Sequence, residues 1–304
     1  MLLAGLAYSS ALTVPYLWDD HLLLEGLGAG GSSIGERLGA AWGPFLGVYF
    51  RPLTLTTIAL EAGAGRFASL VSHGLSLGIF LAACLALMSW LKAEQLSSGA
   101  ATLAGGVFAT LPLATEAVLW TSARGDLLVV LFAALALRET ALRFPLRLEG
   151  VGPKPDDSTG GLLAMTVFVL LALLSKEVGI AVAAAVVLRS QWPTFIGQGR
   201  PGGRALWMGL PTGLTLLFFT LRAQILPTLA PQELAAPDGA DRALLVLGTL
   251  GTMFSQILWP YSPDLAIGSR AVPAAGDVSL AFGAIGLLAL GGLVLGAQLR
   301  GARR

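Results

Sequence analysis

Long apolar stretches recur along the whole chain and limit its fold more than any other feature. A helix that crosses the hydrocarbon core of a bilayer needs about 20 mostly apolar residues. Stretches that reach or approach this length occur at about residues 2–17, 67–91, 98–113, 126–142, 161–175, 178–190, 205–221, 243–259 and 278–298. Hydrophobic residues make up 55% of the chain, more than a water-soluble core can bury. The sequence therefore predicts an all-α, polytopic membrane protein with about eight to nine transmembrane segments.

The charges of the loops predict which side of the membrane each connection faces. Basic residues gather in two connections that an even number of crossings separates, one with Arg138, Arg143, Arg147 and Lys154 and the other with Arg189, Arg200 and Arg204. Because positive loops stay in the cytoplasm, the polar linker 143–160 is expected there. The opposite, extracytoplasmic face is then expected to carry the loops 18–66, 115–126 and 175–177.

The chain as a whole, residues 1–304, is expected to form one transmembrane domain without a soluble domain. Its opening segment, 2–17, lacks the basic region of a signal peptide and is expected to be a span. Nine full crossings would leave the basic C-terminal tail outside the cytoplasm. One segment within 161–190 or 243–259 is therefore expected to be re-entrant or incomplete.

The loop 18–66 is expected to hold two short helices that lie on the membrane. Ser33 and Glu36 have the spacing of a capping box, ahead of apolar residues at helical intervals. Arg51 and Pro52 then begin a second helix, with proline at its first position.

Two adjacent acids, Asp19 and Asp20, follow the first apolar stretch. One interpretation is an interfacial stop signal, because a carboxylate at the centre of a membrane helix is costly. The other is that one of the two acts as a general base on an acceptor hydroxyl, with a pKa raised by partial desolvation.

Arg51 and Arg124 are the candidate phosphate ligands of these loops. Arg51 either reaches lipid headgroups or binds a phosphate in bidentate fashion. Arg124 either pairs with Glu116 or binds phosphate, and Asp126 is expected to cap the next helix.

Lys176 and Glu177 stand between two apolar runs with almost no turn residues around them. Adjacent charges in such a position are costly unless they face a cavity or a partner. We therefore expect these two residues to be functional.

Several classes of function lose support from the sequence. A net charge of +1 without a clustered basic face argues against nucleic-acid binding. The single cysteine, Cys84, cannot form a disulfide within the chain, and His21 and His73 are too isolated to form a metal site. The chain also lacks a G-x-x-x-x-G-K-[ST] loop and a G-x-S-x-G elbow.

Five stretches together resemble the membrane portion of the transmembrane and tetratricopeptide-repeat O-mannosyltransferases, which belong to the GT-C class of glycosyltransferases. They are the Asp-Asp pair, "YFRPLTLTTIALEAG", "FATLPLATEAVLWTSARGDLLVVLFAALAL", "LLALLSKEVGIAV" and "YSPDLAI", in the same order from about Asp19 to Ile267. The chain departs from that family at Leu111, where a histidine usually precedes Pro112, and it contains no tetratricopeptide repeats.

The resemblance implies a GT-C-like fold and an inverting transfer of a hexose, with mannose as one candidate, from a polyprenyl-phosphate donor. Asp19 and Asp20 match the acidic catalytic pair, Arg51, Arg124 and Lys176 match basic positions for the donor phosphate, and Glu116 and Glu177 support them. The lipid-linked sugar is then a substrate and not a cofactor. The resemblance assigns no definite cofactor, and it leaves the need for a divalent metal ion open because some GT-C enzymes use one. The expected location is the bacterial inner membrane, with the site on the periplasmic face and a separate repeat protein as a partner.

Two alternatives to an enzyme are considered. The first is a non-catalytic GT-C-derived subunit of a larger membrane complex, in which Gly- and Ala-rich helices pack closely. A transporter has less support, because the charges gather in the loops and not at the midplane of broken helices.

Overall fold

The computed structural model describes residues 2–28, 31–45, 47, 49–111, 114–146, 159–196, 204–226, 239–258 and 285. Within these ranges the regular structure is helical, and the only strand-like pairing is an isolated bridge between Phe45 and Tyr49. The described residues within 1–110, 114–194 and 198–230 form one compact unit. A second unit contains α12, Gly239–Leu258, which forms a single helix.

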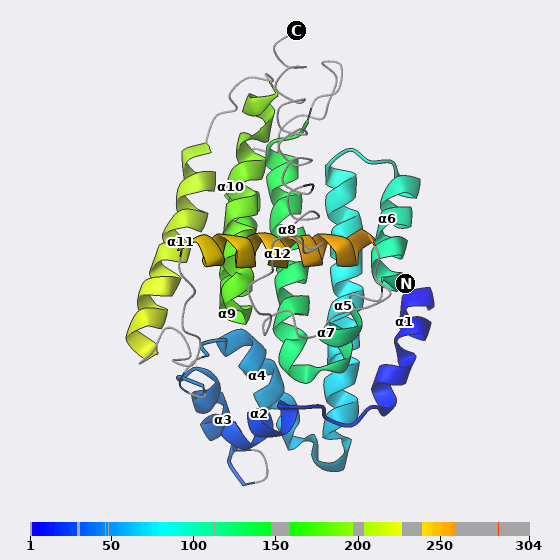
Figure 1. Cartoon of the computed structure of the whole chain (residues 1–304), viewed down its shortest axis with the longest axis vertical. Coiled ribbons are helices and arrows are strands. Elements are labelled where there is room, and N and C mark those ends of the chain that lie inside the picture. The colour runs from blue at the N-terminus through cyan, green and yellow to red at the C-terminus, as the bar shows by residue number, and fades with distance from the viewer. Residues whose placement is uncertain are drawn as a thin grey trace. The chain divides into compact units, whose positions relative to one another are not determined.

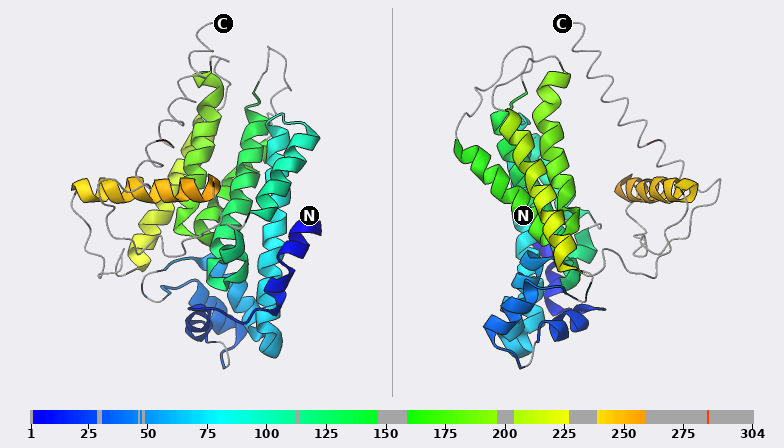
Figure 2. Two further views of the ribbon diagram at one scale, coloured as in Figure 1. Left: turned by 45° about the vertical axis from the view of Figure 1, so that its right-hand side comes forward. Right: turned by 90° about the vertical axis from the view of Figure 1, so that its left-hand side faces the viewer.

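Long helices form the body of the first unit (Figures 1 and 2). They are α5 (Ala68–Ala93), α6 (Ser98–Thr110), α8 (Arg124–Arg143), α9 (Thr159–Ser175), α10 (Ile180–Phe195) and α11 (Arg204–Ile225). α8 packs between α5 and α9, while α6 packs on α5 and α11 on α9. A core of Met165, Val169, Leu173 and Val186 is shared by α9 and α10 and is continued by apolar residues of α8 and α11.

Short helices gather at one end of α5 and α8 (Figure 1). They are α2 (Asp20–Gly26), α3 (Ile34–Ala41), α4 (Pro52–Glu61) and α7 (Thr115–Leu119), with short 3₁₀ segments at Ala62–Phe67, Thr121–Ala123 and Glu177–Gly179. Leu27, Phe45 and Ile58 belong to a small apolar core between α2, α3 and α4. Most of the residues that the sequence singles out lie in these short elements or directly before them.

Local signals explain where α3 and α4 begin, as the sequence predicts. The Ser33 side chain accepts from the Glu36 backbone N–H at 3.3 Å, and Glu36 accepts from the Ser33 N–H at 2.7 Å, which completes a capping box. Pro52 occupies the first turn of α4. Trp42 donates its indole N–H to Thr56 at 3.1 Å and ties the end of α3 to α4.

Three helices in the described part of the chain are long and apolar enough to cross a membrane, which supports a membrane protein. They are Ala68–Ala93, Glu177–Phe195 and Arg204–Ile225, and α9 is a shorter apolar helix. The predicted eight to nine spans are not reached among the described residues. α6 has only 13 residues, and α8 carries charged residues in both terminal turns.

One further expectation about spans is corrected, and two observations concern the segments of which one is expected to be re-entrant or incomplete. Residues 2–17 do not form one spanning helix, because α1 ends at Ala7 and a separate turn follows at Ser9–Thr13. α12 is helical but is not among the three helices that meet the length and apolarity needed to cross. The region 161–190 is two helices, broken at the extended backbone of Lys176. The segment 278–298, apart from Ile285, and most of the linker 143–160 lie outside the described residues.

Candidate functional site

A pocket of about 150 Å³ lies in the first unit, between the short helices and the start of α8. Its walls come from α2, α4, the segment 116–126 and the break between α9 and α10. The lining residues are Asp19, Leu23, Phe45, Tyr49, Arg51, Thr54, Leu55, Glu116, Trp120, Ser122, Ala123, Asp126 and Lys176. Four of the seven residues singled out by the sequence, Asp19, Arg51, Glu116 and Lys176, therefore share one cavity.

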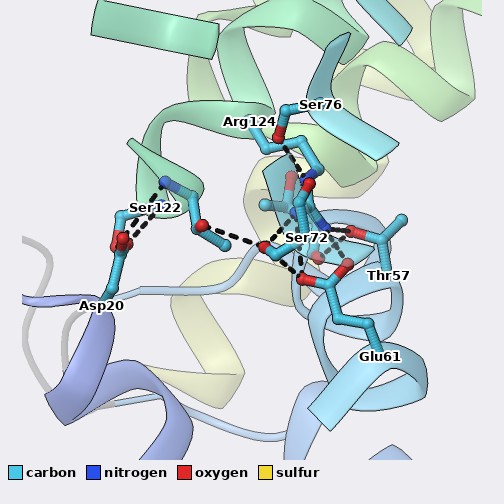
Figure 3. Close-up of polar contacts among 9 residues, drawn as sticks. Asp20, Thr57, Glu61, Ser72, Ser76, Ser122 and Arg124 are labelled. Atoms are coloured by element: carbon cyan, nitrogen blue, oxygen red, sulfur yellow. Dashed lines mark hydrogen bonds and ion pairs between the residues drawn. The ribbon is translucent and has the colours of Figure 1, made fainter. Parts of the chain in front are cut away.

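Asp19 and Asp20 are neighbours in the chain but lie in different surroundings. Asp19 is exposed, lines the pocket and accepts the indole N–H of Trp120 at 2.8 Å. Asp20 is 1% exposed and accepts from the backbone N–H groups of Leu17, Thr121 and Ser122 at 3.0, 3.3 and 2.9 Å. The Ser122 hydroxyl adds a fourth donor at 3.1 Å (Figure 3). Asp20 thus fastens the start of α2 to the turn before α8, and Asp19 is the member of the pair that faces the pocket.

Arg51 forms an ion pair with Glu177, which lies 126 positions further along the chain. Its Nε lies 3.0 Å from Glu177 Oε2, and its guanidinium stands 4.4 Å from the centre of the Tyr49 ring. The second oxygen of Glu177 lies 3.7 Å from Arg222, at the end of α11. Sequence reasoning misses Arg222, although a lone arginine in the last turn of an apolar helix is a signal worth noting.

Lys176 binds both carboxylate oxygens of Asp126, at 2.8 and 2.7 Å. The expected role of Asp126 as a helix cap is wrong, because α8 begins at Arg124 and its N-cap is Ala123. Asp126 instead lies in the first turn of α8, where a negative charge also favours the helix dipole. Each cation that lines the pocket thus already has a carboxylate partner.

The sequence suggests that Arg124 either pairs with Glu116 or binds phosphate. In the structure it does neither, because it pairs with Glu61 and does not line the pocket. It is 0% exposed and binds both oxygens of Glu61, at 2.9 and 3.0 Å. Ser76, Thr57 and the backbone oxygen of Ser72 accept its remaining N–H groups, so all five donors are used (Figure 3). This buried arginine joins α4, α5 and α8 and has no donor left for a phosphate.

Glu116 lines the pocket with a raised pKa. Partial burial is the main cause, the negative charge of Asp126 adds to it, and Lys176 opposes both. Glu116 therefore retains its proton to a higher pH than a solvated glutamate does.

The pocket is lined by two aspartates, a glutamate with raised pKa and two cations, each cation being paired with a carboxylate. These side chains can bind hydroxyl groups, and the cations can bind a phosphate that competes with their carboxylate partners. Among the described residues, no three His, Cys, Asp or Glu side chains gather as a metal ion would require. Comparisons of the chain with protein families, with curated proteins and with solved structures give no match.

Proposed function

We propose that the protein is a membrane glycosyltransferase that moves a hexose from a polyprenyl-phosphate donor to an acceptor hydroxyl outside the cytoplasm. The observation that carries the proposal is the pocket itself. It brings the exposed carboxylate of Asp19 together with Arg51 and Lys176 from distant parts of the chain. A base and cations in one cavity are what this transfer needs, and the sequence resemblance to GT-C enzymes points to the same chemistry.

In the proposed reaction the acceptor oxygen attacks the anomeric carbon of the hexose. Its O–H proton passes to the carboxylate of Asp19, the bond from the anomeric carbon to the phosphate oxygen breaks, and that oxygen keeps the electron pair. The sugar changes configuration once, and polyprenyl phosphate leaves. Arg51 and Lys176 stabilise the charge that develops on the leaving phosphate.

The residue roles differ from those that the sequence suggests. Asp19 replaces the Asp19–Asp20 pair as the base, because Asp20 is buried and satisfied by four donors. Arg124 is removed from the donor site, since Glu61 holds it. Glu177 pairs with Arg51, so a donor phosphate has to compete with it, and Glu116 lines the same cavity as Asp19.

The setting of the reaction is part of the proposal. The chain crosses the membrane several times as a GT-C-like fold, with the pocket on the periplasmic face of a bacterial inner membrane. Mannose is the first hexose to test, and a separate repeat protein is a candidate partner for presenting the acceptor.

A second function is favoured by the closed ion pairs. Lys176 is bound by Asp126 and Arg51 by Glu177, so each lining cation is neutralised without a ligand. Such pairs are also expected in a GT-C-derived subunit that has lost its reaction and serves a larger membrane complex.

Release of polyprenyl phosphate separates the two functions, because it counts turnover whatever acceptor takes the sugar. The protein in lipid nanodiscs is given polyprenyl-phosphate mannose or glucose together with an envelope extract as acceptor source. An enzyme releases polyprenyl phosphate, and Asp19→Asn lowers that release by about 10²–10⁴-fold. Glu25→Gln, which changes an exposed acid on the helix that Asp19 precedes, leaves the release unchanged. A folded wild type that neither binds nor turns over any donor would leave the structural subunit as the function.

A further inference from the structure

Trp18 adopts a backbone conformation that bulky residues rarely take. Its φ is +44°, and among the described non-glycine residues only Gln95 shares a positive φ. The turn that holds it is closed twice by Asp20, whose N–H donates to the Leu17 oxygen at 2.9 Å and whose carboxylate accepts from the Leu17 N–H at 3.0 Å. Strain that is maintained in this way is a reason to look for a function at the strained residue.

The strained turn presents the Trp18 ring outward beside the pocket. The residue is 61% exposed, so burial does not explain its position. Its ring meets that of Trp120 edge to face, with centroids 5.0 Å apart and planes at 85°. Trp120 lines the pocket and donates its indole N–H to Asp19. An exposed ring, a lining ring and the carboxylate of Asp19 therefore form one continuous surface.

This surface has the chemistry of a saccharide subsite. One face of a hexopyranose carries C–H groups that pack on an aromatic ring, and its rim carries hydroxyl groups that bind carboxylates. Fixed aromatic rings supply such contact at little cost in conformational entropy. The tryptophan pair offers the apolar contact, and Asp19 and Glu116, which line the cavity together with Trp120, offer hydrogen-bonding groups.

We propose that Trp18 and Trp120 form the acceptor subsite and that the acceptor is itself a saccharide. This inference rests on the proposed function, in which Asp19 takes the acceptor proton. Because Trp120 is bonded to Asp19, a sugar ring stacked on the tryptophan pair brings a hydroxyl to the base. The lining cations are carried by other elements, Arg51 preceding α4 and Lys176 lying between α9 and α10, and they are left for the donor phosphate.

The first test measures saccharide binding without turnover. Methyl α-mannopyranoside and methyl β-glucopyranoside are offered to the protein in nanodiscs, and saturation-transfer NMR detects contact at their ring C–H protons. We expect Trp18→Ala to weaken binding about tenfold, while Trp18→Phe, which keeps a ring, retains most of it. Trp42→Ala is the matched control, since Trp42 is 54% exposed but its indole N–H bonds to Thr56, which does not line the pocket.

A second arm distinguishes the acceptor sugar from the donor sugar. The glycoside is added to Asp19→Asn protein already loaded with polyprenyl-phosphate mannose, a variant expected to bind without turnover. An acceptor subsite keeps its saturation-transfer signal in the presence of donor. Loss of that signal would assign the tryptophan pair to the donor hexose and overturn the acceptor assignment.

A third arm tests the membrane as the partner of Trp18, since exposed tryptophans also anchor proteins at bilayer surfaces. The fluorescence of Trp18 is the difference between wild type and Trp18→Ala, and brominated acyl chains in the nanodisc quench it if Trp18 enters the bilayer. Such quenching, found together with unchanged glycoside binding by Trp18→Ala, would overturn the proposal. Polyprenyl phosphate release is scored in parallel. Wild-type turnover with glycoside binding insensitive to Trp18 refutes the subsite alone, whereas absence of wild-type turnover with every donor refutes the proposed function.

Discussion

Arg124 and Glu61 are joined by two hydrogen bonds, at 2.9 and 3.0 Å, although 63 residues separate them in the chain. The pair is buried and links α4 to the first turn of α8. That turn directly follows Thr121 and Ser122, whose N–H groups hold Asp20. The geometry of the pocket rim therefore depends on an ion pair that does not itself touch the pocket.

Breaking this pair on one side is expected to destabilise the protein strongly. Glu61→Gln or Arg124→Met leaves a buried charge without its counter-ion, which costs about 3–5 kcal/mol. Thermal unfolding in detergent or nanodiscs measures the loss. Arg138→Met is the control, since Arg138 is partly exposed and its pair with Glu139 contributes about 0–1 kcal/mol. Equal losses from both positions would contradict the structural role of the buried pair.

Asp19→Asn is expected to lower activity, whereas Asp20→Asn is expected to lower stability. Asp19 is exposed, so its variant keeps the wild-type melting temperature, while polyprenyl phosphate release falls by about 10²–10⁴-fold as a general base is lost. Asp20→Asn weakens charge-assisted hydrogen bonds to buried N–H groups and lowers stability by about 1.5–3 kcal/mol. Parallel measurements of melting and turnover separate the two, and a stable Asp20→Asn protein without activity would reverse the assignment.

Glu177→Gln is expected to strengthen the binding of polyprenyl phosphate. Glu177 occupies Arg51 at 3.0 Å, so a donor phosphate has to compete with it, and removing the negative charge is expected to improve affinity about three- to tenfold. Titration of nanodisc-embedded protein with polyprenyl phosphate measures the change. Weaker binding would mean that Glu177 is needed to orient Arg51, and the companion Arg51→Met should then show the same loss.

The stability contributed by Glu116 is expected to fall as pH rises. Its pKa in the folded protein lies above the usual 4.5, chiefly through burial, so between those two values the folded state binds more protons than the unfolded state. Stability from this group is fully present below pH 4.5 and is lost as pH rises through the folded pKa. Glu116→Gln removes the titrating group, so the melting temperature of the variant should rise relative to that of wild type as pH increases. A difference in melting temperature that does not change with pH would refute this prediction.

The sequence by itself determined the features that depend on neighbouring residues. Ser33 and Glu36 predict the start of α3, and Pro52 predicts the start of α4, because capping and proline geometry act within one turn. The charges of Lys176 and Glu177 similarly mark the break between α9 and α10, since they interrupt an apolar run. Apolar length predicts helices but overstates the spans, because 2–17 contains two short pieces and not one helix.

Only the tertiary structure decided which of these charges meet. The sequence treats Asp19 and Asp20 alike, and the packing of the 120–122 turn buries one and leaves the other at the pocket. The sequence suggests Arg124 as a phosphate ligand, yet Glu61 of α4 pairs with Arg124 in the structure. The sequence gives no sign that Arg222 of α11 lies beside Glu177. Partners so distant in the chain leave no local pattern. Their choice follows from the need to pair every buried charge once the helices have packed.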